Sequence, residues 1–201
     1  MANLGYLLRP SLNKNHLYFQ ADDDIWQVSI NGDSVFRAMR LTAGKAPSTH
    51  PHVCPEGKTL AYRGQESGEP GIYLMPTEGG TPKRISHMDG VQIVGWQDAQ
   101  TLILSSTEES PFGRRPFLYH FDLKQETTTP LPYGPATRMD SDEWGNIVLG
   151  RNCGDPAYWK RYRGGTAQEV YLYNLAPQEV YGSKRPSEKT SNKSSKTWKR
   201  T

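Results

Sequence analysis

The segment His50-Pro51-His52-Val53-Cys54 holds the residue types of this chain that are best suited to metal binding. Its two histidines and its cysteine alternate, so an extended backbone would point all three side chains to one face. A structural zinc site needs a fourth ligand, and neither a Cys-x-x-Cys nor a His-x-x-x-His pair lies nearby. We favour the alternative, a strand approach that leads into the Pro55-Glu56-Gly57 turn. The sequence therefore predicts no metal and no cofactor.

Nucleophilic hydrolysis would need a serine, a histidine and a carboxylate in one constellation. Serines are plentiful, but no Gly-x-Ser-x-Gly turn occurs, and the sequence offers no convincing helix to follow such a turn. We therefore expect the histidines to be packed or solvent-facing, and we predict no catalytic residue. The five histidines are His16, His50, His52, His87 and His120.

Two charged clusters offer other binding chemistry. Asp22-Asp23-Asp24 carries the carboxylates that hard cations prefer, but it lacks the spacing of an EF-hand loop, so a solvated turn between strands is favoured. The run Trp159-Lys160-Arg161-Tyr162-Arg163 mixes aromatic and basic residues, which suits base stacking or a peptide carboxylate. We favour a connecting segment in which the aromatics pack and the long basic side chains lie along the surface.

The charge of the chain is unevenly distributed. The 201 residues carry a formal net charge of +3, but residues 176–201 contribute +5 and the preceding part −2. A mildly acidic repeat region argues against a nucleic-acid partner. The mean hydropathy of −0.74 and the absence of any apolar run near 18 residues predict no membrane-spanning helix. Only two cysteines and no visible secretory signal lead us to expect a cytoplasmic protein.

These candidate residues lie within four similar units. Each unit has a short apolar strand, a second strand with a central aromatic residue and a third segment rich in serine, threonine or proline. The first strands recur at intervals of 43, 42 and 45 residues. A period of roughly 40–50 residues with several short strands predicts a β-propeller. The starting residues of the units are Leu17, Leu60, Leu102 and Ile147.

One aromatic residue recurs in each unit, and packing between neighbouring blades explains the pattern without a ligand. If Trp26 is fully buried, we expect Trp26→Ala to cost roughly 3–5 kcal/mol. Glycines such as those of Glu78-Gly79-Gly80 serve turns, because none lies between a strand and a helix as a phosphate-binding loop requires. The recurring aromatics are Trp26, Tyr73, Tyr119 and Tyr171.

Asp24-Ile25-Trp26-Gln27-Val28 is followed by Arg40-Leu41-Thr42, and a Cys-Pro-Glu-Gly-Lys turn and a Glu-Gly-Gly turn occur further along the chain. In these features the chain resembles the N-terminal propeller of the tricorn protease family, and the first segment resembles its first blade. Cys54-Pro55-Glu56-Gly57-Lys58 resembles its recurrent Ser-Pro-Asp-Gly-Lys turn. Ile72 to Gly80 resembles a strand followed by Glu-Gly-Gly, a pattern shared with TolB-like propellers. The most specific segment runs from Tyr158 to Gly165, and the resemblance covers roughly residues 5–175.

The resemblance implies a cytoplasmic serine peptidase with a six-bladed and a seven-bladed propeller, a PDZ-like domain and catalytic α/β domains, which cleaves peptides downstream of the proteasome and forms large hexamers. This chain shows about four blades and nothing that resembles the second propeller, the PDZ-like domain or the catalytic part. We therefore expect an all-β fold, an incomplete six-bladed propeller over residues 1–175 with a disordered basic tail over 176–201. We therefore expect a truncated or interrupted gene product or a cut-down homologue.

The expected function is that of a non-catalytic propeller piece, inactive alone, which in a full peptidase confines or channels peptides. The alternative is a stand-alone TolB-like scaffold for protein–protein interaction, and a third is a small propeller hydrolase that uses carboxylates and a central metal. The expected partners are peptides and other peptidase domains or subunits. Self-association through open blade edges is also expected.

Overall fold

The computed structural model describes residues 6–31, 34–35, 37–65, 68–88, 90–113, 115–142, 144–152, 168–175 and 178–183. Apart from a short 3₁₀ helix, η1 (Pro111–Gly113), the regular elements of this part are all β-strands. The chain folds as two compact units, Met1–Pro132 and Tyr133–Thr201. No described helix is long and apolar enough to cross a bilayer.

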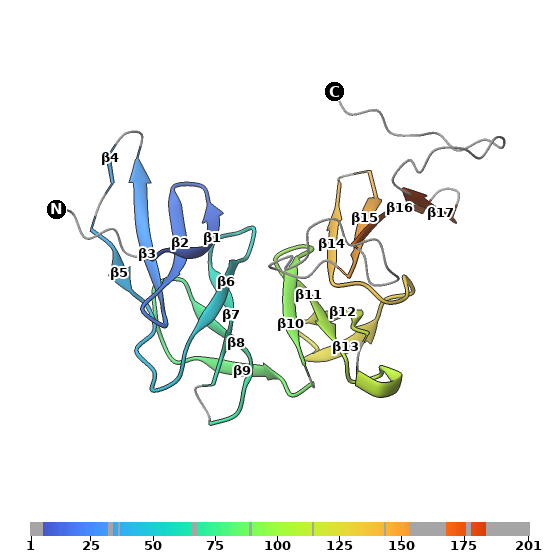
Figure 1. The fold of residues 1–201 in the computed structure, drawn as a ribbon. Coiled ribbons are helices and arrows are strands. Elements are labelled where there is room, and N and C mark those ends of the chain that lie inside the picture. The colour runs from blue at the N-terminus through green and yellow to red at the C-terminus, as the bar shows by residue number, and fades with distance from the viewer. Residues whose placement is uncertain are drawn as a thin grey trace. The chain divides into compact units, whose positions relative to one another are not determined.

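The first unit contains three antiparallel sheets, which we call blades 1 to 3 (Figure 1). Within each blade the strands lie side by side in chain order, and in blade 1 the short strand β5 also pairs with β3. Blade 1 consists of β1 (Leu8–Asn13), β2 (His16–Ala21), β3 (Asp24–Asn31), β4 (Ser34–Val35) and β5 (Met39–Arg40). Blade 2 consists of β6 (Thr49–Val53), β7 (Thr59–Gly64), β8 (Gly71–Pro76) and β9 (Lys83–Ser86). Blade 3 consists of β10 (Gln92–Trp96), β11 (Thr101–Ser106), β12 (Phe117–Asp122) and β13 (Thr127–Pro130).

The second unit contains one sheet of the same order, which we call blade 4. Its strands are β14 (Arg138–Ser141), β15 (Asn146–Arg151), β16 (Glu169–Leu175) and β17 (Gln178–Ser183). Tyr133 meets Tyr173 edge to face at 4.9 Å between ring centroids. The Arg151 guanidinium lies 4.5 Å from the centroid of the Tyr171 ring, within the distance of a cation–π contact.

All four blades have the same register between their second and third strands. Leu60 pairs with Met75, Leu102 with Phe121 and Ile147 with Tyr173, and Leu17 and Val28 pair at the same position of blade 1. Because side chains alternate across a strand, every blade has two equivalent faces. The back face carries the positions of Leu60, Tyr62, Tyr73 and Met75 in blade 2. The front face carries the positions of Ala61, Ile72 and Leu74.

The core of the first unit forms where the front face of one blade packs on the back face of the next. Tyr18 and Ile25, from the front of blade 1, cluster with five residues of blade 2: Val53, Leu60, Tyr62, Tyr73 and Met75. Ala61 and Ile72, from the front of blade 2, cluster with Val91 and with blade 3 residues Ile93, Leu102, Leu104 and Phe121. Blade-on-blade packing of four-stranded sheets confirms the all-β propeller fold that the repeats predicted.

The recurring aromatic residues are not equally buried. Tyr73 and Tyr119 are each 2% exposed, whereas Trp26 and Tyr171 are half-buried. Tyr73 stacks on Tyr62 at 5.8 Å between ring centroids, in the contact between blades 1 and 2. Trp26 occupies the equivalent position on the back of blade 1, where the described residues place no preceding blade. The condition of full burial on which the Trp26 prediction depends is therefore not met, and we expect the large packing energy at Tyr73 instead.

A further strand follows the predicted boundary at residue 175 directly. Gln178–Ser183 form β17, which pairs with β16 along its whole length, from Leu175↔Gln178 to Val170↔Ser183. A strand at the edge of a sheet pairs with one neighbour and has its other edge open to solvent. Polar residues such as Gln178 and Glu179 are therefore compatible with an edge strand. Residues 184–201, the rest of the predicted tail, lie outside the described residues, and their disorder stays a prediction.

Candidate functional site

The connections between the second and third strands of the blades, which we call BC connections, differ most in length. They comprise two residues in blade 1 (22–23), six in blade 2 (65–70), ten in blade 3 (107–116) and 17 in blade 4 (152–168). The other connections within blades span two to six residues. In Figure 1 the three BC connections of the first unit lie at the lower ends of their sheets. Because loops on a rigid scaffold carry most binding functions, this side of the first unit is the candidate functional region.

The aromatic residue of the third strand bonds to a residue in the BC connection of its blade, or directly beside that connection, in blades 1, 2 and 4. Trp26 Nε1 donates a 3.0 Å hydrogen bond to the carbonyl of Ala21, which directly precedes the connection. The Tyr73 hydroxyl donates to the Glu69 carbonyl at 3.2 Å. In blade 4 the Tyr171 hydroxyl donates to the carboxylate of Glu169, the first residue after the connection. The repeated aromatic thus makes a polar contact at the BC end of the sheet, and in blade 2 this contact ties the sheet to its loop.

Tyr119 faces the longer BC connection of blade 3. Its hydroxyl is buried without a hydrogen-bond partner among the described residues. Burial, together with the negative charges of Glu109 and Glu108 in the connection, raises the pKa of Tyr119 from 10.0 to about 12. Both effects favour the neutral phenol, so Tyr119 stays protonated at neutral pH and is a poor general base.

An arginine on the last strand of the blade, β5 in blade 1 and β9 in blade 2, makes a second contact to the BC side. Arg40 Nε donates to the Thr42 carbonyl at 2.9 Å, and Arg84 Nε donates to the Ser86 carbonyl at 3.2 Å. Each guanidinium also forms an ion pair beside the connection: Arg40 with Asp24, and Arg84 with Glu69 at 2.8 Å. The hydrogen bond from Arg84 lowers the pKa of Glu69. Sequence analysis missed this contact, although the repeated Arg-x-Thr/Ser pattern at residues 40–42 and 84–86 signals it.

The three aspartates of blade 1 have different surroundings. Asp22 and Asp23 are exposed and form a two-residue turn, with φ of 49° and 63°. That left-handed pair matches a type I′ hairpin, in which Asp is one of the favoured residues. Asp24 is buried, and its carboxylate accepts a 2.8 Å hydrogen bond from Thr42 Oγ1. The solvated turn predicted for all three is confirmed for Asp22 and Asp23 and wrong for Asp24.

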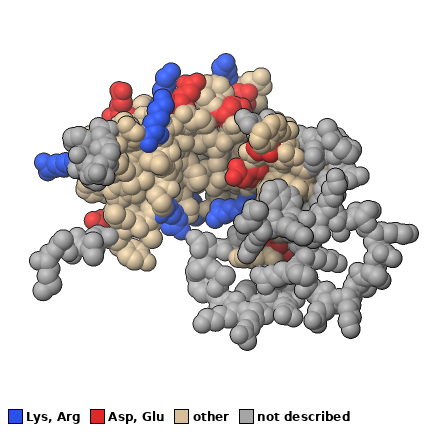
Figure 2. Space-filling view, turned by 90° about the horizontal axis from the view of Figure 1, so that it is seen from above, with Lys and Arg blue, Asp and Glu red and all other residues tan. Residues whose placement is uncertain are grey.

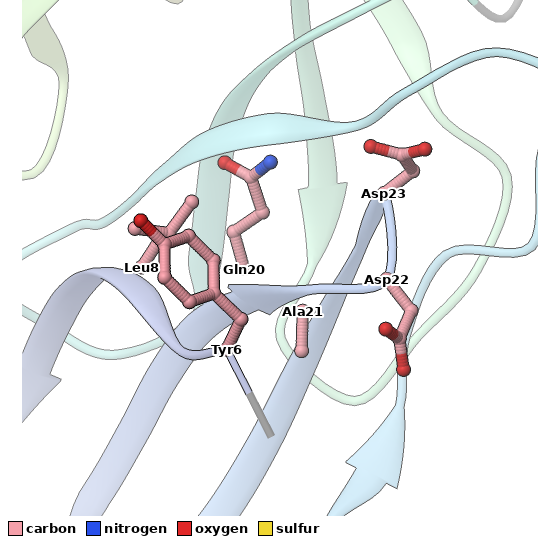
Figure 3. Close-up of a pocket in the computed structure, with 6 residues that line it drawn as sticks. All are labelled: Tyr6, Leu8, Gln20, Ala21, Asp22 and Asp23. Atoms are coloured by element: carbon pink, nitrogen blue, oxygen red, sulfur yellow. The ribbon is translucent and has the colours of Figure 1, made fainter. Parts of the chain in front are cut away.

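A pocket of about 230 Å³ opens beside this turn (Figure 3). Gln20 is buried at its edge and accepts a 3.4 Å hydrogen bond from Arg9. The volume is below the roughly 300–1,000 Å³ of small-molecule sites, so the pocket by itself does not define a ligand. Its lining residues are Tyr6, Leu8, Gln20, Ala21, Asp22 and Asp23.

The His50-Pro51-His52-Val53-Cys54 segment does not have the regular alternation on which the metal interpretation depends. His50 has a φ of 54°, and the pairing of β6 with β7 shifts its register between Thr49 and His52. Cys54 is buried, and its Sγ accepts a hydrogen bond from the Thr59 amide at 3.3 Å. Among the described residues, no three His, Cys, Asp or Glu side chains gather at a distance suited to one metal ion. The segment is the first strand of blade 2, as the favoured alternative predicted.

The histidines are spread over the blades. His16 and His87 are exposed, while His50, His52 and His120 are half-buried. His120 Nε2 is buried and has no hydrogen-bond partner among the described residues; burial lowers the pKa of this histidine, and Asp98 opposes the effect. The basic and aromatic run at 159–163 lies outside the described residues. It belongs to the BC connection of blade 4, because β15 and β16 on either side of it pair directly.

Charged side chains of both signs are interspersed on the face seen in Figure 2, with broad uncharged areas between them. The described residues of this face form no continuous basic track of the kind that follows a phosphate backbone. Figure 2 is seen from above, whereas the BC connections of the first unit lie at the lower ends of their sheets in Figure 1. The contacts at the BC side itself involve loop carbonyls, the Tyr73 hydroxyl and a carboxylate paired with Arg84.

Repeated antiparallel sheets, packed front to back in the first unit and with an aromatic residue recurring at one position of every third strand, define a β-propeller protein. The chain belongs to the family of the tricorn protease N-terminal β-propeller domain, whose model matches residues 4–200.

The chain matches relatives that are much longer than itself and also a relative of similar length. Tricorn protease homolog 1 of Streptomyces coelicolor is 33% identical over 172 residues, which cover 84% of this chain and 16% of that protein. The chain therefore spans about a sixth of the length of such relatives. A protein of Sulfurisphaera tokodaii named as a tricorn-like protease N-terminal subunit is 27% identical over 172 residues, which cover 84% of this chain and 86% of that protein.

Solved structures show the same fold. The crystal structure of the tricorn protease matches with a TM-score of 0.73 at 24% identity and covers 89% of this chain and 18% of that chain. A TolB-like protein of Agrobacterium tumefaciens matches with a TM-score of 0.68 at 17% identity, over 90% of this chain and 63% of that chain. The tricorn and TolB-like resemblances drawn from the turns and strands are thus confirmed at the level of fold.

Proposed function

We propose that this chain is a non-catalytic propeller part of a tricorn-type protease, which associates with the domains or subunits that carry the catalytic residues and confines or channels peptides toward them. The observation that carries the proposal is the family match over residues 4–200, with a named N-terminal subunit of similar extent among the relatives. Cytoplasmic location belongs to the same proposal. The first unit contributes rigid blades and anchored BC connections, which suit a guiding surface better than a reaction centre.

The proposal is tested by reconstitution. The purified chain is mixed with a tricorn-type catalytic polypeptide that lacks this region, and co-elution and hydrolysis of fluorogenic peptides are measured. We expect a stable complex, no hydrolysis by the chain alone, and a changed length preference of the catalytic part when the chain is present. Hydrolysis by the chain alone that persists through independent preparations, or the absence of any complex, would overturn the proposal.

The fold similarity to a TolB-like protein favours a second candidate, a scaffold for protein–protein interaction. This alternative predicts binding to a protein without peptidase activity and no effect on peptide hydrolysis. The same co-elution experiment distinguishes the two functions, because only the first requires the peptidase polypeptide as the partner.

A further inference from the structure

The pocket of Figure 3 lies where the first strand of blade 1 meets the BC connection of that blade. Leu8 of β1 pairs with Gln20 of β2, and the register shifts between Leu8 and Ser11. Arg9, inside this shift, has a φ of 50°. Such a bulge bends a strand away from its neighbour. The pocket of about 230 Å³ lies at this bend, beside Gln20 and the Asp22-Asp23 turn.

Gln20 brings an unused hydrogen-bond donor to the pocket. Its side chain is 8% exposed, and its Oε1 accepts the 3.4 Å hydrogen bond from the guanidinium of Arg9. The other terminal atom is therefore Nε2, which carries two N–H groups. Among the described residues Nε2 has no acceptor. Because a buried amide donor without an acceptor is costly, an acceptor placed in the pocket by a ligand would be stabilised.

The turn beside Gln20 brings negative charge to the same pocket. Asp22 and Asp23 both line it, and neither forms an ion pair with any described residue. In Figure 3 the two aspartates lie on one side of Gln20, and Tyr6 and Leu8 lie on the other. The pocket therefore offers carboxylates at one end and an amide donor next to them.

The turn that carries the carboxylates is held at both ends. The carbonyl of Ala21, directly before the turn, accepts the 3.0 Å hydrogen bond from Trp26 Nε1. The carbonyl of Asp23 accepts a 2.8 Å hydrogen bond from the amide of Ser48, a fully buried residue. A framework that is already ordered loses less conformational entropy when a ligand binds. The two carboxylates are thus presented by a fixed backbone.

A ligand that matches this arrangement needs a cationic group for the carboxylates and a nearby acceptor for the amide of Gln20. The free N-terminus of a peptide has both, because its ammonium and its first carbonyl are attached to the same α-carbon. We propose that the pocket binds the N-terminal residue of a peptide, with the α-ammonium toward Asp22 and Asp23 and the first carbonyl oxygen accepting from Gln20 Nε2.

Other cations fit this pocket less well. A lysine side chain brings its charge without an acceptor beside it. A metal ion finds no group of three His, Cys, Asp or Glu side chains among the described residues. The volume of about 230 Å³ is below that of sites which enclose a whole small molecule, and it suits the end of a longer chain. The Tyr6 ring at the edge of the pocket adds an aromatic face that attracts an ammonium group.

This inference rests on the proposed function, since it names the part of a peptide that the propeller holds. Its test measures peptide binding to the 201-residue chain alone, without a catalytic polypeptide. Loss of this binding together with an intact complex in the reconstitution experiment would remove only the pocket. Intact binding without a complex would remove only the proposed association.

The experiment compares two fluorescent peptides by anisotropy. Both are short alanine peptide amides with fluorescein at the C-terminal end, and one has a free N-terminus whereas the other is acetylated. The double variant Asp22→Asn, Asp23→Asn removes the two charges, and asparagine tolerates the same left-handed turn. Gln20→Met removes the donor and keeps a side chain of similar volume. Glu78→Gln, at an exposed residue between β8 and β9 that does not line the pocket, is the control. Circular dichroism with thermal unfolding verifies that each variant is folded.

We expect the unmodified chain and Glu78→Gln to bind the free-amine peptide at least about tenfold more tightly than the acetylated one, because only the first has a charge-assisted contact. This preference should disappear in the double variant. It should also fade as the pH rises through about 8, where a free α-amino group loses its proton. Gln20→Met should bind the free-amine peptide at least about twofold more weakly.

Several outcomes would overturn the proposal. They are no binding of the free-amine peptide, equal binding of both peptides by the unmodified chain, an unchanged preference in the double variant or in Gln20→Met, and a lost preference in Glu78→Gln. An acetylated peptide with one lysine that binds as tightly as the free-amine peptide would also overturn it, because the pocket would then recognise any ammonium group.

Discussion

Tyr73 combines the two roles that the repeated aromatic residue has in this fold. Its ring is 2% exposed and stacks on Tyr62, and its hydroxyl donates to the Glu69 carbonyl. We expect Tyr73→Ala to lower the free energy of unfolding by about 3–5 kcal/mol, because a large cavity forms between blades 1 and 2. Tyr73→Phe removes only the hydrogen bond and should cost about 0.5–1.5 kcal/mol. Urea denaturation measures both changes.

Trp26→Ala provides the comparison for this prediction. The Trp26 ring is half-buried, so its truncation should cost less than that of Tyr73. An equal or larger cost at Trp26 would contradict the assignment of the main packing energy to the contact between blades 1 and 2.

Tyr119 should make the chain sensitive to alkali. Its pKa is about 12 in the folded chain and near the ordinary value of 10.0 when unfolded. Above pH 10 the unfolded chain can ionise this phenol while the folded chain cannot, so stability is lost as the pH rises from about 10 to about 12. In Tyr119→Phe this loss should be smaller than in the unmodified chain. Denaturant titrations at several alkaline pH values measure the difference, and identical pH profiles would contradict the burial of a neutral Tyr119.

The sequence indicated which residues recur but not what surrounds each of them. The spacing of Trp26, Tyr73, Tyr119 and Tyr171 identified the aromatic position, because one side chain per blade must fill the same space. Burial at that position depends on the blade that precedes it, which is why Trp26 differs from Tyr73. The contacts of Asp24 were hidden for a similar reason, since Arg40 and Thr42 approach it from a later part of the chain.

At the scale of the element, Arg40 explains how the short strand β5 is held to blade 1. β5 has only two residues, but Arg40 extends from it to the buried Asp24, whose carboxylate also accepts from Thr42. Thr42 Oγ1 in turn accepts a 2.9 Å hydrogen bond from the Ile25 amide. This series of contacts holds β5, and the connection that follows it, to β3.

We therefore expect Asp24→Ala to lower the free energy of unfolding by about 2–3 kcal/mol, because it leaves the Thr42 hydroxyl and the Arg40 guanidinium without their acceptor. Asp22→Asn is the matched control. Asp22 is exposed, and asparagine tolerates the same left-handed backbone, so its effect should stay within about 0.5 kcal/mol. Chemical denaturation compares the two variants, and equal effects would show that the Asp24 cluster contributes nothing to stability.

The strands with regular alternation were predictable, and the first strand of each blade was less so. The repeats identified the second and third strands from their apolar and aromatic residues. Strands β1, β6 and β10 each have a shift of register against their neighbour, between Leu8 and Ser11, Thr49 and His52, and Ile93 and Gly95. Such bulges interrupt the period of two that signals a strand in sequence.

At the scale of the whole molecule, the terminal strand β17 tests where the fold of the second unit ends. A chain truncated after Leu175 lacks β17 and leaves β16 with an unpaired edge, so it should unfold at a lower temperature and aggregate more readily. A chain truncated after Ser183 keeps every described strand and should match the full chain within about 0.5 kcal/mol. Thermal unfolding with light scattering measures both, and equal behaviour of the two truncations would exclude a stabilising role for β17.

The family was recognisable from sequence because turn motifs and strand period are local properties. The extent of the domain was not, since the match reaches residue 200 whereas the composition changes near residue 176. A basic, serine-rich composition indicates that a segment is well solvated. It does not indicate whether the backbone of that segment pairs with the edge of a sheet.

The stepwise lengthening of the BC connections, from two to 17 residues, has an evolutionary consequence. The entropy cost of closing a loop grows only with the logarithm of its length, about 0.6 kcal/mol per doubling, so the sheets tolerate insertions at this side at little thermodynamic expense. New sequence can accumulate there while the blade contacts remain intact. Within a blade, a longer BC connection can thus change the surface beside the sheet without changing the register of the strands that carry it.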